Sequence, residues 1–132
     1  MSTELTECFV APVLWKHIKP LRATLVERPS VGTLAVPADI CRQIDSALET
    51  MLKVSLGLGR EVSRVRVYCL VDDQRHLVLG VADNGPTYDV RSQILLSEVG
   101  ERAHKLGGVL RLGDLLLDGE MAVELSIPLP SN

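Results

Sequence analysis

The run Asp83-Asn84-Gly85-Pro86 places a carboxylate among turn-forming residues at the end of an alternating apolar segment. Asn-Gly and Gly-Pro pairs are strong turn signals, so the run predicts a loop that begins where a strand ends. A carboxylate there accepts hydrogen bonds, which suits it to bind the amino group of a ligand in a groove beside the loop. The alternative is a turn without a binding role, and the four residues taken alone favour that alternative.

The histidines show no catalytic or metal-binding pattern. His17, His76 and His104 lie far apart in the sequence and have no cysteine or carboxylate at the spacing of a metal site. The residue types also contain no arrangement that indicates a Ser/His/Asp centre or a nucleophilic cysteine. We therefore expect no metal site and no catalytic residues of these kinds.

The cysteines point to the compartment. Cys8, Cys41 and Cys69 are odd in number and include no CxxC pair. They predict reduced thiols of a cytoplasmic protein, and neither a disulfide framework nor a zinc site. The first residues, MSTELTECFV, contain two glutamates and lack the basic and apolar regions of a signal peptide.

A glycine pair lies before the first clear strand, and a basic stripe lies around the start of that strand. Gly57-Leu58-Gly59-Arg60 is a GxG sequence without the Lys-Ser/Thr of a P-loop, so we interpret it as a helix end. Arg60, Arg64 and Arg66 then form a small basic stripe on the expected exposed face of a strand. A solvated face is the simplest interpretation, and a docking patch for an acidic partner is the alternative.

The elements that must position these residues become clear from residue 37 onward. Apolar residues at spacings of three and four predict a helix from about 38 to 56, ended by Gly57 and Gly59. Its buried face is expected to contain Ile40, Ile44, Ala47, Leu48, Met51, Leu52 and Ser55.

A hairpin and a second helix follow. Alternation over 65–71 and 77–81, around the polar turn 72–75, predicts an antiparallel hairpin. A helix closed by Gly107-Gly108 comes next. Its buried face is expected to contain Leu95, Val99, Ala103 and Leu106. Strands are then predicted at Val109–Leu112, at Leu115–Leu117 and, after an Asp118-Gly119 turn, at 121–127.

The first third of the chain is punctuated by prolines. Pro12, Pro20, Pro29 and Pro37 limit any helix that runs through them. A short helix around Val13–Lys19 and an extended segment at Leu21–Glu27 are predicted. We assign residues 1–36 to an N-terminal extension that packs on a domain of residues 37–132.

This order of elements predicts an α+β fold: a two-layer sandwich with a mixed, mostly antiparallel sheet covered by helices on one face. The length of 132 residues suits a single domain with its own core, and 46% hydrophobic residues exclude intrinsic disorder. No apolar run reaches the roughly 20 residues of a membrane span. A net charge of −3 argues against a nucleic-acid partner.

Several of these segments resemble the ATP-binding domain of sensor histidine kinases, within the GHKL (Bergerat-fold) ATPases, and most closely the nitrate-sensor branch. VRVYCLVDDQRHLVLGVADNG is similar to the family hairpin that ends in the first glycine box, DNGxG. VGERAHKLGGVLRL and GEMAVELSIPLP are similar to the family's later helix and closing strand. RQIDSALETMLKVS aligns with its N-box helix, so the resemblance covers roughly residues 40 to 130.

The resemblance implies a nucleotide site with the fold of that family. Its aspartate, which accepts a hydrogen bond from the adenine amino group, would be Asp83, followed by the box glycine Gly85. Thr50 stands where the family has the N-box asparagine that helps to hold magnesium, and Thr87 stands where it has the second box glycine. These four residues are the expected nucleotide-binding positions if the site is retained.

Other positions depart from the family pattern. Ser46 and Val54 replace the N-box glutamate and histidine, and Gln93 and Leu95 replace glycines of the second box. Those glycines let the backbone approach phosphates closely, so their loss removes the phosphate end of the site. His17 is followed by Ile18 and not by an acid, which argues against a phosphoacceptor role.

These departures predict a degenerate, non-catalytic domain that regulates or binds another protein in signal transduction. No cofactor is expected, and ATP with magnesium would bind only if the site still functions. The partner would be a signalling kinase or a response regulator, or a second copy in a homodimer, with no nucleic acid or membrane. The alternative is a working ATP-binding domain of a two-component sensor kinase or of an anti-sigma-type serine kinase.

The expected partner surface lies around residues 86–91. Tyr88 is one of four aromatic residues and stands in a loop, where aromatic side chains often anchor interfaces, and Arg91 lies beside it. The alternative is that Tyr88 packs on its own domain.

Overall fold

The computed structural model describes residues 7–22, 26–27, 29, 31–113 and 119–130. Three helices and seven strands are assigned within these residues. In chain order they are β1 (Glu7–Phe9), α1 (Val10–Ile18), β2 (Val26–Glu27), β3 (Ala35–Pro37), α2 (Ala38–Leu56), β4 (Val65–Val71), β5 (His76–Asp83), α3 (Val90–His104), β6 (Val109–Gly113) and β7 (Met121–Pro128).

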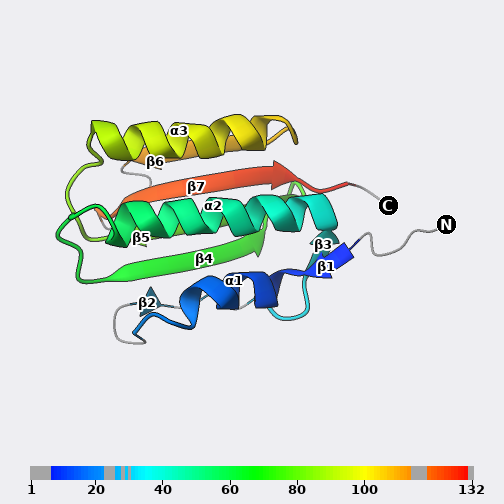
Figure 1. The fold of residues 1–132 in the computed structure, drawn as a ribbon. Coiled ribbons are helices and arrows are strands. Elements are labelled where there is room, and N and C mark those ends of the chain that lie inside the picture. Colours follow the sequence, from blue (N-terminus) through cyan, green and yellow to red (C-terminus); the bar gives the residue numbers. More distant parts are fainter. Residues whose placement is uncertain (1–6, 23–25, 28, 30, 114–118, 131–132) are drawn as a thin grey trace.

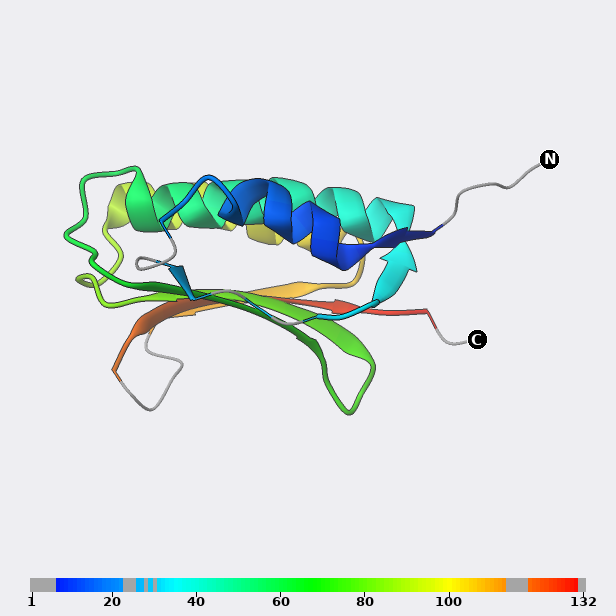
Figure 2. The same cartoon turned by 90° about the horizontal axis from the view of Figure 1, so that it is seen from below.

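Five of the strands form one sheet in the order β2-β4-β5-β7-β6. The four strands β4, β5, β7 and β6 pair antiparallel, and β2 adds to the edge in parallel with β4. The helices lie side by side on one face of this sheet (Figures 1 and 2). The structure therefore confirms the predicted two-layer α+β fold with a mixed, mostly antiparallel sheet.

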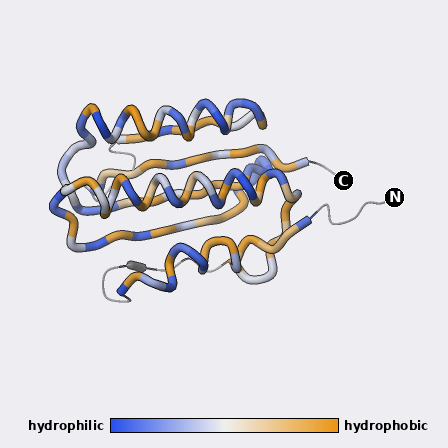
Figure 3. The backbone as a smooth tube through the Cα atoms, viewed as in Figure 1, coloured by the Kyte–Doolittle hydropathy of each residue, from blue (hydrophilic) through white to orange (hydrophobic). Residues whose placement is uncertain are grey.

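α2 is the central helix of the helical layer, and its apolar residues at spacings of three and four form one side of the core. It spans Ala38–Leu56, as predicted, and Gly57 follows as its C-cap. All seven residues predicted for its inner face are buried, together with Cys41 and Val54. Figure 3 shows the corresponding change between hydrophobic and hydrophilic residues along the helix.

The inner face of the sheet is built by alternation along its long strands. The hairpin of β4 and β5 is antiparallel, as predicted, with Cys69 opposite Leu79. Alternate residues of β4, β5 and β7 face the helices and are each at most 1% exposed: Val65, Val67, Leu77, Leu79, Val123 and Leu125. These side chains pack with Leu48 in one hydrophobic core.

Two of the four residues predicted for the buried face of α3, Val99 and Ala103, are buried in the structure. Ser92, Leu96, Val99 and Ala103 are buried, whereas Leu95 packs on the core only in part. The helix ends at His104, so the predicted member Leu106 lies beyond it. The helix begins at Val90, where the Asp89 side chain acts as the N-cap and accepts a hydrogen bond from the Ser92 backbone N–H.

The N-terminal segment shares the core of the remaining domain. α1 begins at Val10, three residues before the predicted start, because Pro12 is tolerated in a first helical turn. Val10, Leu14 and Ile18 are buried in the same core as α2. The predicted extended segment at Leu21–Glu27 contains β2, and its residues 23–25 lie outside the described residues. The predicted strand 115–117 and Asp118 also lie outside them.

The prediction of three reduced thiols is wrong for one pair. Cys8 and Cys41 form a disulfide, with their Cα atoms 6.6 Å apart. Pairing of β1 with β3 places Cys8 opposite Val36, and β3 leads directly into α2, whose first turn carries Cys41. The bond depends on contacts between distant segments, which cysteine count and spacing do not reveal. Cys69 is free and buried.

Among the described residues, no helix combines the length and the apolar character that a membrane crossing requires.

Replacing Leu48 by alanine tests the assignment of the core. Leu48 is fully buried, so Leu48→Ala is expected to lower the free energy of unfolding by ~2–5 kcal/mol through the cavity it leaves. The control is Glu49→Ala at the exposed neighbouring position of α2, which is expected to stay within about 0.5 kcal/mol of the wild type. Urea unfolding measures both, and equal effects of the two substitutions would contradict the assignment.

Thiol labelling tests the cysteine assignment. Burial raises the pKa of Cys69 to about 12, so little reactive thiolate exists at pH 8. We expect no rapid labelling of the native oxidised protein, labelling of Cys69 alone after denaturation, and labelling of all three cysteines after reduction and denaturation. Mass spectrometry counts the labels, and rapid labelling of a native thiol would be the opposite result.

Candidate functional site

Asp83 lies at the end of β5, where the centre of the sheet meets the loop to α3. Its neighbours in the register are Val65 of β4 and Met121 of β7. The residue is 0% exposed, so the carboxylate predicted to contact a ligand is buried inside the protein. A buried carboxylate requires paired charge and hydrogen bonds.

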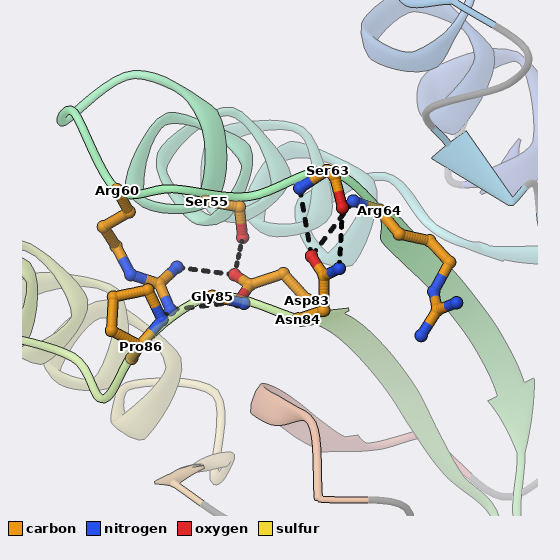
Figure 4. A network of polar contacts seen from close by, with 8 residues as sticks. All are labelled: Ser55, Arg60, Ser63, Arg64, Asp83, Asn84, Gly85 and Pro86. Carbon is orange, nitrogen blue, oxygen red and sulfur yellow. Dashed lines mark hydrogen bonds and ion pairs between the residues drawn. The ribbon is translucent and has the colours of Figure 1, made fainter.

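Arg60 supplies the positive charge that balances the buried Asp83 carboxylate. It comes from the loop between α2 and β4, and its side chain is 4% exposed. Nη1 donates to Asp83 Oδ2 at 2.6 Å and Nη2 donates to Asp83 Oδ1 at 2.9 Å, as Figure 4 shows. The guanidinium therefore grips both carboxylate oxygens in the two-pronged geometry that makes arginine–carboxylate pairs strong. Nη2 also donates to the Pro86 carbonyl.

Two further donors complete the surroundings of Asp83. The Ser55 hydroxyl, from the last turns of α2, donates to Oδ2 at 2.7 Å. The Gly85 backbone N–H donates to Oδ1 at 2.9 Å. With the two bonds from Arg60, each oxygen accepts two hydrogen bonds, which fills the roughly four acceptor sites of a carboxylate.

Asn84 and Gly85 hold the Arg60 loop against the end of β5. Asn84 Oδ1 accepts from the backbone N–H groups of Ser63 at 3.0 Å and Arg64 at 3.1 Å, and its Nδ2 donates to Ser63 Oγ at 2.8 Å. A Cβ at Gly85 would lie 2.7 Å from Val62 Cγ2 and 3.0 Å from Arg60 Nη2. The glycine is thus needed for the close approach of the loop.

Tyr88 lies beneath the guanidinium. Its ring centroid is 4.7 Å from Arg60 Cζ, a cation–π distance, and the residue is 3% exposed. Burial, followed by the charge of Asp83, raises the pKa of the phenol. Of the two alternatives for this residue, the structure shows the one in which Tyr88 packs on its own domain.

The N-terminus of α3 carries an anion from its own chain. Asp89 Oδ1 accepts from the Ser92 backbone N–H at 2.8 Å, and this bond lowers the pKa of the exposed Asp89 carboxyl. The Gln93 amide donates to the Tyr88 carbonyl at 3.0 Å. The helix end that attracts anions through its free N–H groups is therefore already capped by a carboxylate.

The predicted site residues are brought together only in part. Asp83 and Gly85 belong to one hydrogen-bonded cluster. Thr87 is exposed in the loop before α3, Arg91 is exposed in its first turn, and Thr50 is half-buried in α2. The four bonds to the Asp83 carboxylate use neither threonine.

The predicted basic stripe is wrong at Arg60, whose side chain turns inward from the loop instead of lying on a strand face. The other two arginines lie toward Glu120: Arg66 at 2.6 Å and the more exposed Arg64 at 3.9 Å. The Arg64 side chain points away from the Asp83 cluster (Figure 4). Among the described residues, no three His, Cys, Asp or Glu side chains gather in a way that could hold a metal ion.

Sequence reasoning missed Arg60 and Ser55 as partners of Asp83. The sequence could have indicated Ser55, because a polar residue on an otherwise apolar helix face needs a buried hydrogen-bond partner. The indication for Arg60 is weaker. The hairpin register pairs Val65 with Asp83, so residues shortly before 65 must pass close to that carboxylate.

Comparison with known proteins shows the fold. No protein-family model matches the sequence, and no curated protein matches it. The ATP-binding domain of PrrB from Mycobacterium tuberculosis superposes with a TM-score of 0.70 at 17% identity, over 96% of this chain and 98% of that chain. A histidine kinase from Burkholderia phymatum gives 0.67 at 15% identity, over 96% of this chain and 71% of that one.

A further similar structure is larger than this chain. The blue-light activated histidine kinase of Erythrobacter litoralis superposes over 91% of this chain with a TM-score of 0.62 at 17% identity. This chain spans 42% of its length. The fold is therefore that of histidine kinase ATP-binding domains.

A double-mutant cycle tests the buried pair. Arg60→Met leaves the Asp83 charge uncompensated and is expected to lower the free energy of unfolding by ~3–5 kcal/mol. Arg60→Met combined with Asp83→Asn is expected to cost less than the sum of the single substitutions, because no buried charge remains. Urea unfolding measures the cycle, with Arg64→Met as the exposed control. Additive effects would show that the two side chains are not coupled.

Proposed function

We propose that this chain is a histidine-kinase-like ATPase domain with a degenerate site, and that it acts as a non-catalytic regulatory or protein-interaction module in signal transduction. The fold provides the context, because its neighbours are ATP-binding domains of histidine kinases. The observation that carries the proposal is the saturation of Asp83 by its own chain.

A ligand amine needs a free acceptor at Asp83. Arg60, Ser55 and the Gly85 N–H already supply four hydrogen bonds to the two carboxylate oxygens. An entering base would have to displace a charge-assisted pair that lies almost wholly out of solvent. One hydrogen bond to a charged group contributes only ~1.5–3 kcal/mol, whereas micromolar binding needs about 8 kcal/mol.

The residues around the N-terminus of α3, where a triphosphate would lie, offer little additional binding free energy. Asp89 occupies the N-terminus of α3, so a triphosphate placed there would meet a like charge. Gln93 and Leu95 bring side chains to positions where the similar family has glycines. Magnesium prefers several hard oxygen ligands, and Thr50 offers one hydroxyl in place of an asparagine amide. The residues present therefore do not fit magnesium and a triphosphate, and we derive no phosphoryl transfer for this chain.

A protein partner remains the proposed ligand of the domain, either a signalling kinase, a response regulator or a second copy. The surface around residues 86–91 still supports this, although Tyr88 is buried. Val90 is 72% exposed and Ile94 is 57% exposed on the adjoining turns of α3, next to the exposed Arg91. An aliphatic pair beside a cation suits a protein surface better than a small ligand.

The second candidate is a working ATP-binding domain of a sensor kinase or of an anti-sigma-type serine kinase. One observation favours it: Asp83 and Gly85 stand together at the end of a central strand, where the resemblance places the contact with adenine.

Calorimetric titration with ATP, with and without magnesium, distinguishes the two candidates. We expect no magnesium-dependent binding tighter than about 100 μM, which corresponds to roughly 5.5 kcal/mol. The ATP-binding domain of PrrB serves as the positive control under the same conditions. Tighter magnesium-dependent binding that is lost in Asp83→Ala would replace the proposal by the second candidate.

A further inference from the structure

α1 lies at one edge of the helical layer, and α2 separates it from α3 (Figure 1). Its inner side belongs to the core, with three residues that are each at most 1% exposed: Val10, Leu14 and Ile18. The opposite side is exposed at positions that helical geometry places on one face: Pro12, Trp15, Lys16 and Lys19. We call these four residues, together with the exposed Arg22 just beyond the helix, the α1 surface.

The α1 surface is cationic in an acidic chain. Residues 8–26 contain two lysines, one arginine and no carboxylate, whereas the whole chain has a net charge of −3. Lys16 Nζ donates to Asp45 Oδ2 of α2 at 2.8 Å, so that lysine is already neutralised. Within the described part of the chain, Lys19 and Arg22 form no ion pair. Two positive charges are therefore left to complement an acidic partner.

Aromatic side chains are exposed at α1 and packed elsewhere. Trp15, the one tryptophan of the chain, is 41% exposed, and Phe9 at the N-cap of α1 is 58% exposed. Of the two tyrosines, Tyr88 is buried and Tyr68 is half-buried. Aromatic residues are enriched in protein interfaces, where they act as anchors. Both exposed aromatic residues of this chain thus lie at the same helix as its unpaired cations.

An apolar recess opens beside Trp15. Its lining comes from α1 and from the chain before β3: Ala11, Leu14, Trp15, Ile18, Pro29 and Val31. A recess of this kind accepts an aliphatic group and gives a charged group no partner. Lys19 follows Trp15 by four residues, so the cation lies next to the recess on the helix surface. The surface therefore offers an apolar contact with positive charge beside it.

We propose that the α1 surface binds an acidic segment of another protein, which places an aliphatic side chain beside Trp15 and carboxylates against Lys19 and Arg22. An anionic membrane is a poorer match, because Glu7 is exposed on the same side of β1 as Phe9 and would meet the same headgroups. A protein partner can leave that carboxylate in solvent. This inference goes beyond the proposed function, since the partner surface proposed above lies on the α3 side, across α2 from α1.

Titration with two synthetic peptides tests the proposal. One peptide consists of glutamate and leucine, and in the other every leucine is replaced by serine. Fluorescence of Trp15 reports binding at the surface itself, because the chain has one tryptophan. We expect the leucine peptide to bind about tenfold more tightly than the serine peptide, because only a leucine side chain fills the recess. We also expect added salt to weaken binding, because the carboxylates and the exposed cations are screened.

Charge reversal tests the cations of the surface. Lys19→Glu/Arg22→Glu is expected to weaken binding of the leucine peptide by about tenfold or more, because two attractions become repulsions. The control is Arg102→Glu/Lys105→Glu, which makes the same change of charge at exposed positions at the end of α3 and is expected to stay within about twofold of the wild type. Trp15→Ala, measured by anisotropy of a labelled peptide, is expected to lose about tenfold.

The charge variants keep the proposal testable if Trp15→Ala does not fold, because they change only exposed side chains. Circular dichroism checks the fold of each variant.

Several results would overturn the proposal. One is the absence of leucine-peptide binding up to about 1 mM. Another is an equal loss in the two charge-reversed variants, because the attraction would then belong to the chain as a whole. Binding to phosphatidylserine vesicles in place of the peptide, lost in Lys19→Glu/Arg22→Glu, would assign the surface to a membrane. Self-association of the chain that is lost in the same variant would assign it to a second copy.

Discussion

The buried carboxylate of Asp83 is the constraint on which this end of the molecule depends. A charge at 0% exposure at the end of a central strand must be neutralised, and the chain supplies Arg60 from the nearest loop. The Gly85 backbone N–H and the inward Ser55 of α2 supply the remaining hydrogen bonds to the same carboxylate. The position of Tyr88 follows as well, because its ring covers the apolar face of the guanidinium.

The Asp83 network is separate from the features that this chain shares with structures of the same fold. Similarity to histidine kinase ATP-binding domains extends over almost the whole chain, yet identity is 17% or less in the structures PrrB and the Burkholderia phymatum kinase. What is shared is the path of the backbone through the sheet and the helices, as the TM-scores of 0.70 and 0.67 show. The Asp83 cluster is built from loops and strand ends, where polar groups can change partners without disturbing the core.

The N-terminal segment shows a second way in which distant parts complete the domain. α1 adds Val10, Leu14 and Ile18 to the core that α2 forms with the sheet. The short β1–β3 pair then brings Cys8 beside α2, where it bonds to Cys41. Both contacts tie the N-terminal residues to the central helix, which also carries Ser55 of the Asp83 cluster at its other end.

Sequence by itself determined the elements with strong periodicity. The limits of α2, the β4–β5 hairpin, the last strand and the layered α+β architecture follow from spacings of two and of three to four, because burial of one face imposes these periods. Asp83 was also found at its place at the end of a strand. On α3, the predicted Val99 and Ala103 are buried, whereas Leu95 is only partly buried and Leu106 lies beyond the end of the helix.

Tertiary structure alone decided which groups meet. Arg60 and Asp83 are 23 residues apart, and Cys8 and Cys41 are 33 apart. No local pattern encodes such pairs, since each depends on the path of a loop or on a two-strand pairing far from the residue itself. The sequence thus determined where a carboxylate would stand, whereas the packing of a loop on a strand end decided that its partner would be an arginine of the same chain.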